Sequence, residues 1–264
     1  MSSEGAPTWT SGYGVGEGWN LQGTLLYESS ENAFVLFDSA IGENANSLHI
    51  IATRPGGTTI GSVDCPSIGN AVTTDLVGLG KGQFLLSAGT PQSVNSEGAG
   101  WLVKIQHDDS CVWVRQVEGP GAGSAVAAVE DSYGRFLVCG SALPPETQTR
   151  DIYVAAFDQS GKQLRYRTYG GGTPDFATEM VATEDGGVVL VGTSVDYGGD
   201  SGILALNIGP GGEALWAEVL GGPHDAGVSI HRTSDGGFLI GANCGPDDSE
   251  GKSVRIIKLS SDTP

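Results

Sequence analysis

Basic residues are scarce in this 264-residue chain, which has 13 Lys and Arg against 31 Asp and Glu and a net charge of −18. Nucleic acids and anionic membranes are both bound by basic surfaces that neutralise phosphates. The composition therefore excludes a nucleic-acid partner and adhesion to an anionic membrane. Two interpretations of the charge stay open: an acidic surface that keeps the protein soluble, or one that attracts cations or a basic partner.

Long apolar segments are also missing. Gly and charged residues interrupt every hydrophobic run well before the roughly 18 positions that a membrane span needs, so we expect no membrane insertion. The N-terminal residues 1–5 lack the positive charge and apolar stretch of a secretory signal. We therefore expect a soluble, cytoplasmic protein, with an extracellular location as the alternative if a leader has been removed.

Metal-binding and nucleophilic motifs are absent from the sequence. The four cysteines have no CxxC spacing and lie in different parts of the chain: Cys65, Cys111, Cys139 and Cys244. Disulfide bonding requires Cα atoms within about 7 Å, so we expect free thiols in a reducing compartment. The histidines lack zinc-site spacing, and no GxSxG occurs. We expect no cofactor.

What the chain does have is a repeat of about 51 residues. Equivalent apolar runs open at Phe34, Phe84, Phe136, Val188 and Phe238. A second series, Gly119, Gly170 and Gly221, recurs with the same period. A fixed period of this length indicates a row of similar small structural units.

Each unit has the pattern of four short strands. Apolar runs of four to six residues are bounded by Gly, Pro, Asp and Ser, and tight turns are predicted at Gln159–Gly161 and Pro210–Gly212. No stretch has a convincing helical period, and the 43 glycines are too many for helix interiors. The predicted class is all-β, and four-stranded units of this size indicate a β-propeller.

Counting the units predicts five blades of four antiparallel strands in one domain, 1–264. The expected blades cover residues 19–63, 70–117, 123–168, 176–219, and 225–259 together with 8–14. The segment 8–14 resembles 215–221, so we expect the N-terminal strand to complete the last blade and close the ring. Closure would remove two free strand edges.

Loops on one face of the predicted ring carry the candidate site. The loops that enter the innermost strands supply the ligand-face candidates Glu17, Asp64, Asp175, His224 and Asp225. The loops between second and third strands add Glu43, Glu97, Glu146, Asp151, Asp196, Asp200, Asp247, Asp248 and Glu250. Loops on a rigid scaffold commonly carry function, so we expect an acidic binding face there.

Four of these acids are weak candidates for a calcium site: Asp196, Asp200, Asp247 and Asp248. Calcium prefers several converging oxygen ligands, which these loops offer, but their spacing does not match an EF-hand.

The repeat also resembles a known family. Asp235-Gly236-Gly237-Phe238, a strand that ends at Lys258-Leu259, and Trp216 before Gly221-Gly222 are similar to bacterial and archaeal propeller repeats of the SBBP and delta-60 type. Those repeats are related in architecture to WD40, Kelch and PQQ-type propellers. The first unit departs from the pattern with Glu31-Asn32-Ala33-Phe34, and the Trp-Asp ending of WD40 units is missing. The resemblance implies a propeller fold and a binding or scaffolding role, often at a cell surface.

We therefore expect a monomeric, non-catalytic binding or scaffold propeller that contacts a protein partner or a small or carbohydrate ligand at its acidic loop face. The alternative is a carbohydrate-active protein, either a lectin or a five-bladed glycoside hydrolase. A hydrolase needs two carboxylates about 5–10 Å apart, which Glu17, Asp175 and Asp225 would supply if they converge.

Overall fold

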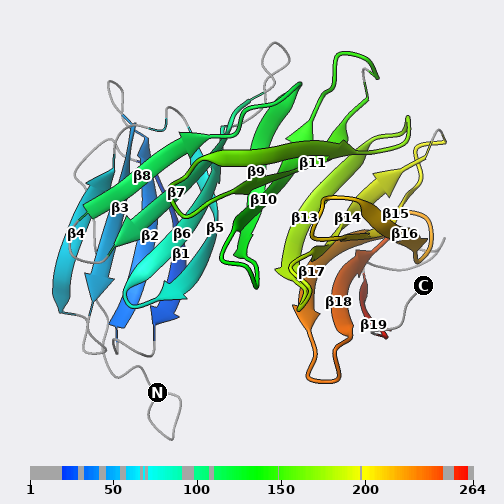
Figure 1. The fold of residues 1–264 in the computed structure, drawn as a ribbon. Helices are drawn as coiled ribbons and strands as arrows, with labels where there is room; N and C mark the ends of the chain where they lie inside the picture. Colours follow the sequence, from blue (N-terminus) through cyan, green and yellow to red (C-terminus); the bar gives the residue numbers. More distant parts are fainter. Residues whose placement is uncertain are drawn as a thin grey trace, which may run out of the picture.

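The computed structural model is built from 19 β-strands, and no helix occurs among the residues that it describes (Figure 1). No described segment therefore forms a helix that could cross a membrane. The described residues are 20–28, 33–41, 46–53, 58–65, 68, 71–90, 98–106, 110–147, 149–196, 198–245 and 253–260.

The strands form antiparallel sheets in chain order. The first sheet has β1 (Asn20–Glu28), β2 (Ala33–Ile41), β3 (Asn46–Thr53) and β4 (Thr59–Cys65). The second has β5 (Val72–Gly80), β6 (Gln83–Gly89), β7 (Gly100–Gln106) and β8 (Ser110–Gln116). The third has β9 (Ala122–Glu130), β10 (Phe136–Ala142), β11 (Asp151–Phe157) and β12 (Gln163–Tyr169).

The fourth sheet has β13 (Asp175–Ala182), β14 (Val188–Val195), β15 (Ser201–Ile208) and β16 (Ala214–Leu220). The last sheet has only β17 (Ala226–Arg232), β18 (Phe238–Cys244) and β19 (Ser253–Leu259). The first strands of successive sheets lie side by side, in the order β1, β5, β9, β13 and β17. This is a β-propeller-like arrangement in which each of the four four-stranded sheets is a blade.

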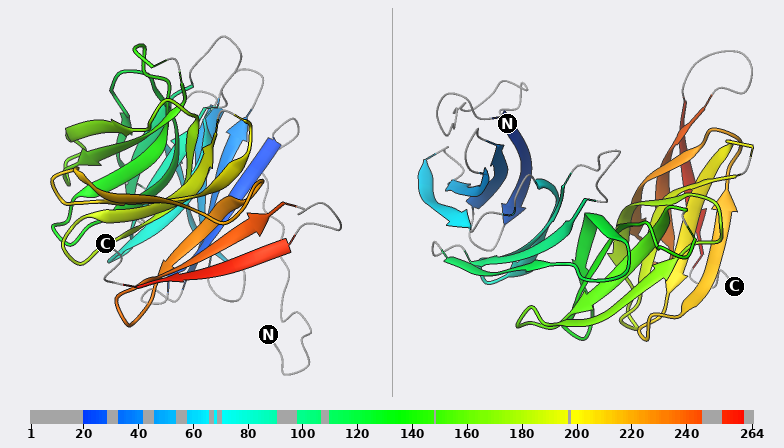
Figure 2. Two further views of the ribbon diagram at one scale, coloured as in Figure 1. Left: turned by 90° about the vertical axis from the view of Figure 1, so that its right-hand side faces the viewer. Right: turned by 90° about the horizontal axis from the view of Figure 1, so that it is seen from above.

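The predicted closed ring of five four-stranded blades is wrong. The described chain has four complete four-stranded blades followed by a three-stranded sheet. Figure 2 shows the first and last sheets at opposite ends of a curved row. The predicted closing strand, 8–14, lies outside the described residues. The repeat period specifies strands within a unit, but it contains no information on how the two ends of the row are placed.

Turn chemistry explains why the hairpins form where the sequence predicts them. In the turn between β11 and β12, the Asp158 Oδ1 accepts hydrogen bonds from Ser160 N at 2.9 Å and Lys162 N at 3.0 Å. Gly161 has a φ of +80°, a conformation that glycine adopts without steric cost. Hydrogen bonding holds the pKa of Asp158 below its ordinary value.

The core lies between the blades. Leu85 and Leu102 of the second blade pack with Phe136 and Tyr153 of the third, and all four are fully buried. Every residue of β11 is buried, as expected for a strand covered on both faces. Burial of apolar area at roughly 25 cal/mol per Å² is therefore the main force that holds one blade against the next.

Inner-strand carboxylates connect neighbouring blades directly. The Asp75 Oδ2 on β5 accepts a hydrogen bond from Ala128 N on β9 at 3.0 Å. The Glu179 Oε2 on β13 accepts one from Ile230 N on β17 at 2.8 Å. Both acids lie at register shifts of their strands. A bulge of this kind redirects a side chain away from its own sheet, here toward the next blade.

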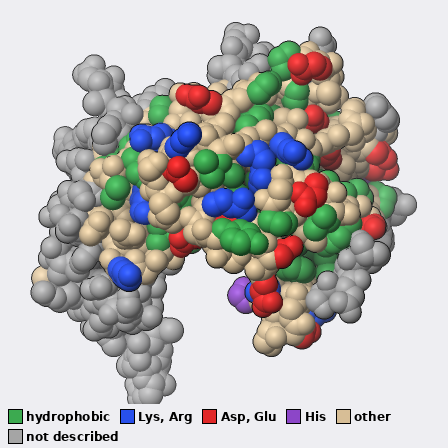
Figure 3. All heavy atoms as spheres, viewed as in Figure 1, with side chains coloured by type: hydrophobic (Ala, Val, Ile, Leu, Met, Phe, Trp, Pro, Cys, Tyr) green, Lys and Arg blue, Asp and Glu red, His purple; other side chains and the backbone are tan. Residues whose placement is uncertain are grey.

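Outer-strand arginines form a second set of links between blades. The Arg115 Nε on β8 donates to Gly161 O at 3.0 Å, and the Arg167 NH1 on β12 donates to Gly212 O at 3.0 Å. Each arginine thus bonds a carbonyl in the next blade's outer hairpin. Figure 3 shows Lys and Arg side chains gathered over the region of β8 and β11. Much of the scarce positive charge is used to join blades.

The expectation of four free cysteines is wrong. Cys65 on β4 and Cys111 on β8 form a disulfide with a Cα–Cα distance of 5.4 Å, which joins the outer strands of two blades. Sequence spacing does not reveal that these strands are neighbours. Cys139 and Cys244 are free and buried, and burial raises the pKa of Cys139 to about 12, so its thiol is unreactive.

We predict that Glu179→Ala lowers the free energy of unfolding by about 1–3 kcal/mol, because the buried Ile230 N–H loses its acceptor. Glu179→Gln keeps an acceptor oxygen and is the matched control, with a smaller effect. Urea unfolding measures both. Equal losses in the two variants would contradict the role given to this hydrogen bond.

We also predict that replacing both Cys65 and Cys111 by serine costs about 2–4 kcal/mol of stability, because the bond no longer restricts the unfolded chain. Chemical denaturation with and without a reducing agent checks this. The reductant should destabilise the wild type and leave the double variant unchanged. A wild type insensitive to the reductant would argue against the bond.

Candidate functional site

The two sets of loops predicted to share one face do meet at the fourth blade. Asp175 N donates to Arg150 O at 2.7 Å, and Val195 N donates to Pro174 O at 2.9 Å. On the other side, Asp225 N donates to Ser201 O at 3.2 Å. These hydrogen bonds hold the start of β13 beside the end of β14. They also hold Asp225, which precedes β17, beside the start of β15.

Asp175 is the first residue of β13, and only 7% of it is exposed. Burial raises the pKa of its carboxyl, and a hydrogen bond with Ser194 offsets part of that rise. Ser194 is the residue opposite Asp175 on β14, so strand register places this partner. The result is a buried acid beside a hydroxyl at the loop end of the blade.

Asp151, the first residue of β11 in the preceding blade, is 5% exposed. Its Oδ1 is buried and has no hydrogen-bond partner among the described residues. Burial raises the pKa of this carboxyl, and the nearby charge of Asp175 raises it further. A buried polar oxygen without a donor is costly, and a bound water, ion or other group that supplies a donor is one explanation for such an atom.

Gly170 explains how the Asp151 carboxyl fits. A Cβ at position 170 would lie 2.1 Å from the Asp151 Oδ1, so only glycine leaves room for the acid. The Oδ1 therefore lies directly against a residue of the groove wall, because Gly170 also lines the hollow beside the fourth blade. Asp175 thus lines one end of that hollow, and Asp151 lies behind Gly170 at the same end.

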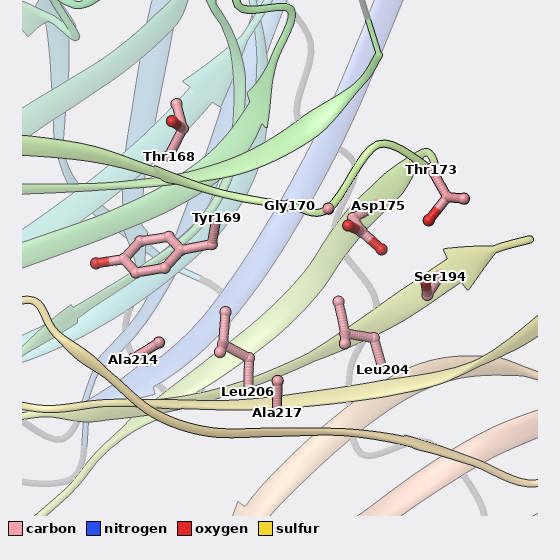
Figure 4. A pocket seen from close by; sticks show the side chains of 11 residues that line it. Thr168, Tyr169, Gly170, Thr173, Asp175, Ser194, Leu204, Leu206, Ala214 and Ala217 are labelled. Atoms are coloured by element: carbon pink, nitrogen blue, oxygen red, sulfur yellow. The ribbon is translucent and has the colours of Figure 1, made fainter. Parts of the chain in front are cut away.

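The groove has a volume of about 520 Å³ and lies between β12 and the fourth blade. Figure 4 shows a polar end, formed by Asp175, Thr173 and Ser194. It also shows an aliphatic floor, formed by Leu204, Leu206 and Ala217. A second hollow of about 330 Å³ shares Thr173 and Ser194 and continues past Asp200 to Pro223. The combined groove is elongated.

Asp225 occupies a similar place at the last sheet but has a different environment. It is 2% exposed, and its Oδ2 accepts a hydrogen bond from Gly222 N at 2.8 Å and pairs with Arg255 NH1. Burial alone would raise the pKa of Asp225, but the Gly222, Cys244 and Arg255 interactions lower it below its ordinary value. This acid is satisfied within the chain.

The remaining candidates are dispersed. His224 is exposed, has a φ of +66°, and its Nε2 lies 3.8 Å from the Asp200 Oδ1. Asp64 lies within strand β4 opposite His49, while Glu17, Asp247 and Asp248 fall outside the described residues. The structure therefore brings Asp175 together with Asp151, while His224 and Asp225 follow Pro223, which lines the far end of the second hollow.

The weak calcium candidates that are described serve a turn. The Asp196 Oδ1 accepts hydrogen bonds from Gly198 N at 2.7 Å and Asp200 N at 3.0 Å. Within the described ranges no three His, Cys, Asp or Glu side chains are grouped so that they could hold a metal ion.

Sequence reasoning included Asp151 only as one of many loop acids and did not single out Ser194 or Leu204. The Gly170–Gly221 period was visible, but the burial of the acid behind Gly170 depends on the packing of two blades. The sequence did contain a usable signal, because the repeat aligns Leu204 with Arg255. The position beside the equivalent acids is thus aliphatic in the fourth blade and cationic in the last sheet.

Comparison with known proteins gives the fold and no family. No family model and no curated protein matches the sequence. A Dyadobacter fermentans protein of unknown function has a similar structure, with a TM-score of 0.57 and 15% identity over 93% of this chain and 80% of that one. A variant of the Synechocystis apocarotenoid oxygenase has a TM-score of 0.52 and 10% identity, over 94% of this chain and 60% of that one.

A mannose phosphorylase from Leishmania mexicana is more distant, with a TM-score of 0.44 and 11% identity over 92% of this chain and 85% of that one. At 15% and 10% identity, the two likenesses with TM-scores above 0.5 show the propeller-like fold alone. The function has to be argued from the site.

We predict that Asp151→Asn becomes progressively more stable relative to the wild type as the pH rises from about 4 to 7. The folded-state pKa of Asp151 lies above its unfolded value, so its stabilising effect is complete below the unfolded value of about 3.9 and is lost as the pH rises through the folded value. Urea unfolding at several pH values measures the difference.

Asp235→Asn is the control with the opposite sign. Hydrogen bonds from Lys258 and Thr233 hold the pKa of Asp235 below its ordinary value, so its contribution appears above the unfolded value and is lost on acidification. A difference for Asp151→Asn that does not change with pH would contradict the buried, uncompensated state of this carboxyl.

Proposed function

We propose that this protein is a non-catalytic binding propeller that holds its ligand in the groove beside the fourth blade, with the Asp151–Asp175 end as the recognition element. The single observation that carries the proposal is the Asp151 Oδ1, which is buried, lacks a hydrogen-bond donor and lies against the groove wall at Gly170. A ligand donor at this oxygen would remove the cost of leaving it unpaired.

The shape of the groove supports the proposal. Ligand sites are concave hollows of roughly 300–1,000 Å³, mostly apolar, with a few polar groups that fix orientation. The main hollow, about 520 Å³, has an aliphatic floor and one polar end. Its walls are β-strands of two packed blades, so the site is rigid before a ligand arrives.

The charge of the molecule supports recognition by acidic groups. Asp175 and the exposed Asp196 and Asp200 all line the groove. Neither hollow has a Lys or Arg among its described lining residues. With a net charge of −18, the surface attracts cationic ligands over distances of about a Debye length. An anionic ligand is disfavoured.

A carbohydrate-active protein is the second candidate, and the raised pKa values of Asp151 and Asp175 favour it. A carboxylic acid with a raised pKa can donate a proton to a leaving group, and glycoside cleavage uses two carboxyls together. The first proposal is preferred because glycoside cleavage needs two carboxyls at the scissile bond, and Asp175 is the only carboxyl among the described residues that line the main hollow.

The test is a binding and turnover screen with defined probes: neutral oligosaccharides, lysine- and arginine-containing peptides, and chromogenic glycosides. We predict that at least one neutral or basic probe binds the wild type, that Asp175→Asn weakens this binding at least tenfold, and that no glycoside is cleaved. Asn removes the negative charge and replaces one acceptor oxygen by an NH2 donor, and a hydrogen bond to a charged group contributes about 1.5–3 kcal/mol.

Asp185→Asn is the matched control, since it removes one charge from an exposed turn between β13 and β14. It should bind like the wild type. Cleavage of a glycoside that Asp175→Asn abolishes would replace the proposal by its alternative. Equal binding by wild type and Asp175→Asn, or no binding of any probe, would refute the groove as the site.

A further inference from the structure

The fourth blade and the last sheet place an acid in the same setting. Asp175 interacts with Ser194 of β14, and Asp225 interacts with Cys244 at the equivalent place on β18. The next strands also correspond, because Leu204 pairs with Gly192 and Arg255 pairs with Ala242. Leu204 and Arg255 are therefore equivalent residues beside equivalent acids.

In the last sheet the chain supplies its own cation. Arg255 lies on β19, and its NH1 is 2.5 Å from the Asp225 Oδ2. The Asp225 side chain is almost fully buried, so an unpaired charge there would be expensive. A positively charged group on an aliphatic stem satisfies the site.

In the fourth blade that cation is missing. Leu204 is 8% exposed and, with Leu206 and Ala217, forms an aliphatic floor that leads to Asp175. Neither Asp175 nor Asp151 forms an ion pair within the described residues, and the Asp151 Oδ1 has no donor. Arg150 directly precedes Asp151 in the sequence, and its guanidinium carbon lies over the Phe176 ring, 5.9 Å from the ring centroid.

We infer that the groove binds a lysine side chain presented by a basic polypeptide, with its ammonium group between Asp151 and Asp175 and its methylene stem on Leu204 and Leu206. The inference rests on the proposed function and names its ligand. It assigns to an external lysine the place that Arg255 fills at the last sheet.

The polar groups favour an ammonium over a guanidinium. Lys has three donors on one compact nitrogen, whereas Arg needs a carboxylate with both oxygens free for a bidentate contact. Asp175 already interacts with Ser194, and Asp151 offers one free buried oxygen. Three donors match in number one oxygen of each acid and a hydroxyl of Thr173 or Ser194, which line the hollow beside Asp175.

The length of the groove favours a polypeptide over a free amine. The second hollow continues from Thr173 and Ser194 along β16, which is the edge strand of its sheet, as far as Pro223. The exposed Asp196 and Asp200 lie along this extension. An extended chain would follow it, and further basic residues would meet these acids.

The experiment is calorimetric titration of the whole protein with a blocked pentapeptide, acetyl-Gly-Ser-Lys-Ser-Gly-amide. We expect binding by the wild type, and at least tenfold weaker binding of the same peptide with an acetylated lysine or with arginine in its place. Asp175→Asn and Asp151→Asn should each weaken binding at least tenfold. Asp185→Asn, which changes net charge equally at a distant exposed turn, should leave it unchanged.

Leu204→Arg provides the most specific test, because it places in the groove the residue found at the equivalent position of the last sheet. It should abolish peptide binding, whereas Leu204→Met should retain it. Thermal unfolding of both variants shows that the fold persists. If Leu204→Arg does not fold, the comparison of Asp175→Asn with Asp185→Asn decides the matter by itself.

Each other outcome has a defined meaning. Equal affinity for the lysine and acetyl-lysine peptides, or equal losses in Asp175→Asn and Asp185→Asn, would overturn the inference. Butylamine binding as tightly as the peptide would overturn the polypeptide part. A neutral oligosaccharide that binds through Asp175, without any lysine binding, would leave the proposed function standing and refute this ligand. Absence of all binding would refute both.

Discussion

No backbone hydrogen-bond ladder connects one described sheet to the next, so side chains supply most of the links between blades, with isolated backbone hydrogen bonds such as Asp175 N to Arg150 O. Apolar packing supplies most of the cohesion, but it does not fix direction. Direction comes from polar links between blades: Asp75 and Glu179 reach the next inner strand, and Arg115 and Arg167 reach the next outer hairpin. The second, third and fourth blades are thereby held at both their inner and outer strands, which positions the loops between these links.

This arrangement has a consequence for the distribution of charge. The chain has only 13 basic residues, and arginines on the outer strands donate to turn carbonyls instead of pairing with loop acids. The acids at the loop ends are therefore left without cations unless a local residue supplies one, as Arg255 does for Asp225. The acidity of the groove end follows from how the blades are joined as much as from the number of acids.

Much of the fold was predictable because it is local. Turn residues such as Asp158 and Gly161 act within a few positions, and alternating apolar residues specify strands. The placement of Asp175 at the loop face was predictable for the same reason. Three features depend on contacts between units: the placement of the two ends of the row, the Cys65–Cys111 disulfide, and the burial of Asp151 behind Gly170. A repeat period does not encode which surfaces of different units touch.

Departures from the repeat are the most informative residues for function. Core and turn positions recur because every blade needs them, so their recurrence carries no information about a ligand. Leu204 in place of an arginine leaves Asp175 without an internal cation, and Asp151 adds a second buried acid at the same end. Burying two acids without a cation costs stability, and a propeller that needed only stability would gain by repeating the Arg255–Asp225 pair. The cost is localised at one hollow, which is the expected arrangement when an external group completes the site.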